Sequence, residues 1–167
     1  MVTPLVWFER QFTFGLPARM LPFYLLRLEG TIARMQALTH NIPDDILSQS
    51  PKGKWPVKQN IGHLAEVDEV SNQRIDQMKA GIATLLPAVF EPQDYTNWPI
   101  DKLLTHFARI RTENIHKYES LSESDLVKSS LHPRLKVEMT PVDLAWFDAE
   151  HDDHHLLKVK EIILNAQ

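Results

Sequence analysis

The sequence predicts an all-α protein, a four-helix bundle with long loops between its helices. Four stretches carry apolar residues at the 3.6-residue period of an amphipathic helix. Only five of the 167 residues are glycine, and β-branched residues are scattered rather than alternating, so no strand is predicted. Four such helices in a chain of this length are typical of one bundle around one core, and we expect a single domain over residues 1–167.

The first predicted helix covers about residues 17–38. Its apolar side chains recur three or four residues apart, at Leu21, Leu25, Leu28, Ile32 and Met35. This spacing places them on one face of a helix. Residues 1–16 are rich in aromatic side chains, and we expect them to pack as an amino-terminal arm across the bundle.

The other three predicted helices begin near prolines and cover about residues 56–83, 99–121 and 141–165. Pro56 and Pro99 can occupy first turns, where a missing N–H costs nothing. In the fourth helix, Thr140 reads as the N-cap, Pro141 as the first helical residue and Asp143 as an acid in the first turn. The connections 41–54, 87–98 and 122–139 are long for a bundle, and long loops often wall substrate pockets.

Composition excludes several classes of function. The net charge is −4 and no block of Lys and Arg occurs, so neither nucleic acid nor an anionic membrane is an expected partner. No apolar run reaches about 18 residues, and the amino terminus lacks the pattern of a secretory signal. The absence of cysteine excludes disulfides, thiolate ligands and a cysteine nucleophile, and we expect a cytoplasmic protein.

The segment "EHDDHHLLKVKEI" at 150–162 indicates a metal site. On a helical wheel, His151 and His155 lie within about 40° of each other and of Leu144 on the apolar stripe. Side chains four residues apart have Cβ atoms about 6 Å apart, so both rings can reach one cation. The alternative is a coincidental pair, or a buried pair satisfied by hydrogen bonds.

His63 is the best third donor, because it lies inside the second helix and faces a neighbouring helix on the wheel. Taken alone, it reads as a histidine on the flank of a helix. The other histidines carry no such signal: His106 and His116 read as surface or edge residues, His40 and His132 lie in loops, and His154 sits at the edge of the apolar stripe.

Nearby carboxylates are candidates to orient the ligands or to act on bound water. The candidates are Asp148, Asp152 and Asp68, and no catalytic residue is assigned. The alternative for each of them is a solvated helix charge, the reading that we favour for Asp153 and Glu66. The spacing does not fit a zinc peptidase, because His151-Asp152 lacks the glutamate of H-E-x-x-H.

Two segments, "WPVKQNIGHL" at 55–64 and "AWFDAEHDDHHLLKVKEI" at 145–162, resemble the DinB-like (YfiT-like) metal-binding four-helix bundles. The opening "WFERQFTFGLPARMLPFYLLRLEGTIARM" at 7–35 is similar to the start of one branch of that family. The resemblance implies metal ligands at His63, His151 and His155, with water at the remaining positions. It also implies a long crossover between the second and third helices and a homodimer. Characterised members of the family include thiol S-transferases and a mycothiol-dependent isomerase.

Two functional hypotheses follow. The first is a metal-dependent enzyme in which three imidazoles hold a divalent transition metal (Zn, Ni or Fe) and activate water or a low-molecular-weight thiol. It would act on a small molecule by thiol transfer or hydrolysis. The second is a non-catalytic bundle that binds metal, dimerises or binds a partner. A closed structural zinc site would need a fourth protein ligand, and no cysteine is available to supply it.

Overall fold

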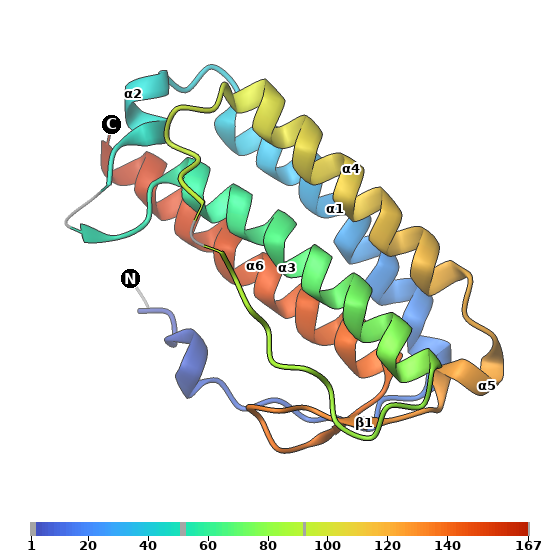
Figure 1. Cartoon of the computed structure of the whole chain (residues 1–167). Coiled ribbons are helices and arrows are strands. Elements are labelled where there is room, and N and C mark those ends of the chain that lie inside the picture. Colours follow the sequence, from blue (N-terminus) through green and yellow to red (C-terminus); the bar gives the residue numbers. More distant parts are fainter. Residues whose placement is uncertain (1–2, 51–52, 92, 167) are drawn as a thin grey trace.

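The computed structural model describes residues 3–50, 53–91 and 93–166, and it has the predicted all-α fold (Figure 1). Four long helices form the bundle: α1 (Leu21–Thr39), α3 (Val57–Lys79), α4 (Ile100–Glu119) and α6 (Pro141–Ala166). The short elements lie in the arm and the connections: the 3-10 helices η1 (Trp7–Glu9) and η2 (Ala18–Met20), the helices α2 (Asp44–Ser48) and α5 (Glu123–Leu126), and the strands β1 (Ser130–Leu131) and β2 (Glu138–Met139).

The bundle has two parallel pairs of helices: α3 runs parallel to α4, and α1 runs parallel to α6. Residues 68 and 76 of α3 pair with residues 111 and 117 of α4, so these two helices run in the same direction. In contrast, residues 60 and 71 of α3 pair with residues 155 and 148 of α6, so that packing is antiparallel. Figure 1 shows the long crossover that carries the chain from the end of α3 back to the start of α4. This crossover is the one that the family resemblance implies.

The apolar core falls into two clusters separated by a polar layer. One cluster includes Leu28, Met78 and Tyr118, and the other includes Met35, Ile61 and Phe107. Between them, Arg111 of α4 makes ion pairs with Asp68 of α3 and Asp152 of α6 at N–O distances of 2.7 and 2.6 Å. Thr31 of α1 donates to Asp152 at 2.6 Å, so all four bundle helices contribute to this buried cluster.

Helix starts follow the sequence signals closely. Thr140 and Asp143 form reciprocal side-chain to backbone hydrogen bonds of 3.2 and 3.0 Å, which confirms the predicted cap of α6. The other carboxylate oxygen of Asp143 accepts from the backbone N–H groups of Gly15 and Leu16, both at 2.9 Å. The cap therefore also ties the amino-terminal arm to α6. Pro56 and Pro99 differ slightly from the prediction, because each is the N-cap residue rather than part of the first turn.

The predicted end of the second helix at about residue 83 is wrong, because α3 ends at Lys79. Gly81 follows with a φ of +74°, a left-handed conformation that glycine adopts without steric cost. The N–H of Ile82 then donates to the carbonyl of Gln77, which closes a Schellman motif. Ile82 matches the helical period, but it lies beyond the helix and its side chain is exposed.

The prediction of no strand is also wrong in one loop, where β1 and β2 form a two-residue antiparallel pair. Leu131 extends this pairing to the crossover: its N–H donates to Ala83 at 2.8 Å and its carbonyl accepts from Leu85 at 3.1 Å. Buried loop backbone needs such partners, which helices would otherwise supply. The pairing joins the connection before α6 to the segment after α3.

The arm and the crossover both pack on the α3–α6 side of the bundle. In the arm, Trp7, Phe12 and Phe14 contact the ring of Phe147 on α6. In the crossover, Tyr95 lies against Gly62 of α3, where a Cβ atom would approach the tyrosine ring to 2.2 Å. Glycine in the interior of this helix therefore lets the crossover pack closely.

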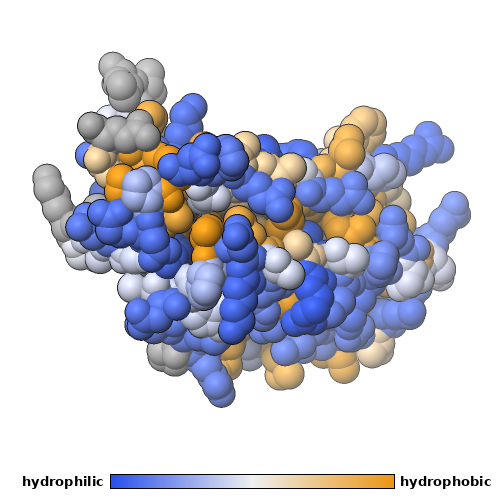
Figure 2. Space-filling view, turned by 90° about the horizontal axis from the view of Figure 1, so that it is seen from above, coloured by the Kyte–Doolittle hydropathy of each residue, from blue (hydrophilic) through white to orange (hydrophobic). Residues whose placement is uncertain are grey.

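The described surface is mostly hydrophilic. The face in Figure 2 is covered largely by hydrophilic residues, with hydrophobic residues showing between them in smaller groups. This distribution is the one expected for amphipathic helices that turn their apolar faces inward. Among the helices of the described ranges, none is both long enough and apolar enough to cross a lipid bilayer.

Candidate metal centre

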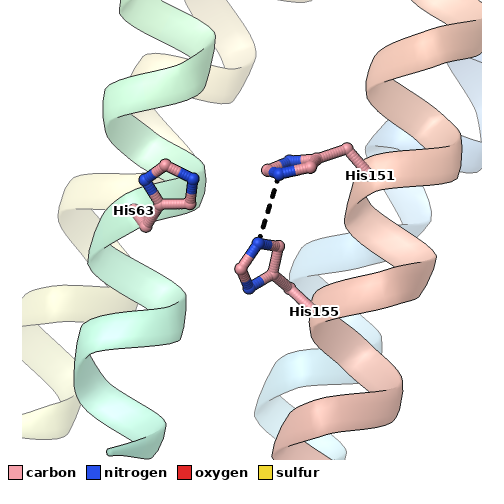
Figure 3. A group of neighbouring side chains, drawn as sticks. All are labelled: His63, His151 and His155. Atoms are coloured by element: carbon pink, nitrogen blue, oxygen red, sulfur yellow. Dashed lines mark hydrogen bonds between the residues drawn. The ribbon is translucent and has the colours of Figure 1, made fainter. Parts of the chain in front are cut away.

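Three histidines from two helices converge beside the core (Figure 3). His63 projects from α3, and His151 and His155 project from successive turns of α6. One ring nitrogen of each lies within 4.8 Å of the others, and the Nε2 atoms of His151 and His155 are 3.2 Å apart. As the helical wheel predicts, His63 faces the neighbouring helix, with its ring 5.2 Å from that of His155. The structure thus brings the predicted trio together.

Asn60 fixes the orientation of His155. The side-chain NH2 group of Asn60 donates to the carbonyl of Pro56 at 2.9 Å, which leaves its Oδ1 as an acceptor. That oxygen lies 2.8 Å from Nδ1 of His155, so the proton of the imidazole sits on Nδ1. The lone pair of Nε2 then points toward His151. Metal-binding histidines in proteins are commonly held by such a partner on the other ring nitrogen.

Glu66 lies beside His63, and the prediction that it is a solvated helix charge is wrong. Its side chain is only 16% exposed, and its Oε2 lies 3.4 Å from Nδ1 of His63. The other oxygen accepts a hydrogen bond of 2.9 Å from the hydroxyl of Tyr95. The crossover therefore holds this carboxylate next to the histidine. The helical period alone predicts that Glu66 is exposed to solvent. The crossover packs on α3 and covers this side chain.

The donor set fits a divalent cation. Burial, reinforced by the positive charge of neighbouring histidines, holds the pKa values of His151 and His155 well below their usual range. Both rings are therefore neutral near pH 7, as metal ligation requires. Among the described residues, the buried Nδ1 of His151 has no hydrogen-bond partner, whereas its Nε2 faces Nε2 of His155. Neutral imidazoles suit Zn, Ni and Fe.

A cavity of about 570 Å³ opens beside the histidines. His63 and His151 line one end of it, and segments 87–90 and 132–134 supply part of its wall. Three aromatic side chains surround the histidines: Trp7 from the arm lies 5.0 Å from His151, and Trp55 and Phe90 lie 4.9 and 5.3 Å from His63. The cavity is large enough for a small organic molecule. As the loop lengths predict, the long connections help to enclose it.

Comparison with known proteins places this geometry in a family. The sequence model of the DinB superfamily matches residues 27–159, which include α3, α4, most of α1 and α6, and the three histidines. The chain belongs to the DinB superfamily. Among solved structures, the fold is similar to that of YfiT from Bacillus subtilis, described as a probable metal-dependent hydrolase with an unusual four-helix bundle topology. The TM-score is 0.81 at 17% identity, covering 95% of this chain and 94% of YfiT. A comparison with curated proteins gives no match.

In this DinB bundle, the carboxylates considered as partners of the ligands lie elsewhere. Asp68 and Asp152 bind Arg111 in the polar layer, and within the described residues neither has a hydrogen bond to a histidine. Asp148 is buried and lines the cavity, where it accepts a hydrogen bond of 2.6 Å from Ser71. Burial raises the pKa of Asp148 to about 7, so this carboxyl can hold or release a proton near neutral pH.

Asp153 keeps part of its predicted exposure to solvent and is also ion-paired. It makes ion pairs with Arg27 and Arg34 of α1 at 2.5 and 2.7 Å, and its side chain is 39% exposed. The parallel packing of α1 against α6 places these arginines over the side of α6 that the wheel assigns to solvent. These contacts join two helices and leave the metal centre untouched.

The remaining histidines stay outside the trio. His40 and His116 are exposed, His106 packs on Trp98, and His154 packs on Trp7 next to the centre. His132 is buried and lines the cavity, which its loop position did not indicate. Its Nδ1 accepts the backbone N–H groups of Arg134 and Leu135 at 3.3 and 3.1 Å. The proton of its ring is therefore on Nε2.

Replacing Asn60 by alanine is expected to weaken metal binding about 10- to 100-fold, because His155 loses the partner that fixes its ring. Competition with a chelating dye measures this affinity. Asn60→Asp keeps the acceptor oxygen and should keep most of the affinity. Asn114→Ala removes another buried asparagine, on α4, and serves as the control. Equal losses in the two alanine variants would show a general effect on packing rather than ligand orientation.

Proposed function

We propose that this chain is a metal-dependent enzyme in which His63, His151 and His155 hold a divalent transition metal: Zn, Ni or Fe. The observation that carries the proposal is the convergence of three imidazole rings, two of which line a cavity that accepts a small molecule. A metal held by three protein ligands keeps open positions for other ligands, and it lowers the pKa of a bound water or thiol toward neutrality. The reaction is thiol transfer to an electrophilic small molecule, or hydrolysis.

The protein residues around the centre have distinct roles in this proposal. Asn60 orients His155, and the aromatic side chains Trp7, Trp55 and Phe90 limit the access of water. Glu66, held by Tyr95 beside His63, is the carboxylate placed to accept a proton there. Asp148 faces the cavity from α6, and its raised pKa lets it exchange a proton with a substrate group.

Turnover by loaded and metal-free protein tests the proposal. Protein loaded with Zn, Ni or Fe is assayed for loss of a thiol in the presence of an electrophile, and for cleavage of small esters and amides. We expect at least about a hundredfold higher rate for loaded protein than for metal-free protein in one of these reactions, since metal activation contributes several kcal/mol. Equal rates in every assay would favour the alternative, a non-catalytic bundle.

A further inference from the structure

An arginine without a partner lies in the same cavity as the histidines. Arg74 of α3 is 8% exposed and lines the cavity. Within the described ranges, its guanidinium has neither an ion pair nor a hydrogen bond, and its buried Nε atom is unsatisfied. A buried charge without a counter-charge is costly, so its presence calls for a ligand or another compensating function.

Asp148 attracts Arg74 but, in the described part of the chain, forms neither an ion pair nor a hydrogen bond with it. Asp148 lies close enough to raise the pKa of Arg74, but burial and the positive charge of Arg134 lower it. The carboxylate of Asp148 is instead hydrogen-bonded to Ser71, at a distance of 2.6 Å. Arg134 also lines the cavity and lies near enough to act on Arg74, so two guanidinium groups share this cavity. An anion bound there would relieve their repulsion.

The spacing along α3 relates this end of the cavity to the histidines. Arg74 follows His63 by eleven residues, which returns the helix to within about 20° of the same direction after about 16 Å of rise. Between them, Val67 and Val70 line the same cavity. One face of α3 thus presents a histidine, then an apolar stretch, then a cation. Side chains of a helix lean toward its amino terminus, so the guanidinium of Arg74 leans toward the histidines.

We propose that Arg74 binds the carboxylate of the substrate, whose apolar middle lies along Val67 and Val70 and whose reactive end lies at the histidines. A guanidinium matches a carboxylate with two parallel N–H···O bonds, and the bond is strong where water is excluded. The substrate class is therefore a small organic acid with its reactive group several bonds from the carboxylate. This assignment rests on the proposed function for the position of the reactive end, whereas the carboxylate site itself does not require the metal.

Binding of hexanoate and of hexanamide to chelator-treated, metal-free protein tests the assignment by calorimetry. The two molecules have the same length and differ in charge. We expect hexanoate to bind at least about tenfold more tightly than hexanamide, because the cation is matched only by the carboxylate. Arg74→Gln should remove this preference. Arg109→Gln, which changes an exposed arginine of α4 paired with Glu113, should keep it.

The outcomes separate this assignment from the proposed function. An equal preference in wild type and Arg74→Gln, or none in wild type, would overturn the carboxylate site. If Arg74→Gln fails to fold, Arg74→Lys decides: a retained preference supports a charge-based site, and a lost preference contradicts it. Metal content is measured on the same variants as purified, before chelator treatment, and should not change with Arg74. Protein that binds no metal yet keeps the carboxylate preference would refute the metal-dependent enzyme and leave the subsite standing.

Discussion

Replacing His151 by alanine is expected to reduce the metal content of the purified protein from about one transition-metal ion per chain to below about a tenth. Loss of one of three nitrogen donors should weaken binding by at least about a hundredfold, or about 2.8 kcal/mol. His63→Ala and His155→Ala should behave in the same way. The measurement is elemental mass spectrometry on protein purified without an affinity tag, before and after reloading with metal.

The matched control is His154→Ala, which removes an adjacent histidine of α6 that also packs against Trp7 but lies outside the trio. This variant should keep the wild-type metal content. A loss of metal in His40→Ala or His132→Ala, with none in the trio variants, would show that the metal is bound elsewhere. Wild-type protein that takes up no metal even after reloading would contradict the metal centre altogether.

Replacing Arg111 by methionine is expected to lower the free energy of unfolding by about 3–5 kcal/mol, because the carboxylates of Asp68 and Asp152 are left buried without their cation. Burial lowers the pKa of the Arg111 guanidinium, but the two carboxylates more than offset this effect, so the net shift is upward. The guanidinium of Arg111 is therefore charged at neutral pH. Unfolding in urea, followed by circular dichroism, measures the loss.

Two comparisons test this explanation. Arg109→Met, on the same helix, breaks an exposed pair with Glu113 and should cost less than about 1 kcal/mol. In Arg111→Met, burial raises the pKa of the two orphaned carboxyls above the unfolded value, so the folded state binds more protons and the stability deficit shrinks as the pH falls. A deficit that is independent of pH would mean that lost packing, rather than unpaired charge, causes it.

The parts of the fold that the sequence predicted depend on local patterns. The Thr140–Asp143 cap and the pairing of His151 with His155 each fall within five consecutive residues of one helix, where period and spacing determine geometry. The end of α3 was missed because Ile82 continues the apolar period, although Gly81 marks the actual end. The strand pair was missed because two-residue strands leave no alternating pattern to read.

The surroundings of the histidines depend on contacts between distant segments, which local patterns do not encode. Tyr95 of the crossover contacts Glu66, and Trp7 of the arm contacts His151. No regular spacing in the sequence links the two residues of either pair. Asn60 carried a usable signal, because it precedes His63 by one helical turn and shares its side of α3. Arg74 carried the same kind of signal, because it follows His63 by about three helical turns. In such sequences, polar residues on the same side of a helix as a predicted metal ligand are candidates for the same site.

The three histidines come from segments that lie far apart in the chain, with His63 separated from His151 by nearly ninety positions. An unfolded chain does not hold these rings together, so a cation that binds all three binds the folded state alone. Binding of the cation then raises the free energy of unfolding. The increase is about 4 kcal/mol when the concentration of free ion is a thousand times the dissociation constant. The melting temperature of this bundle would therefore rise with the concentration of available metal.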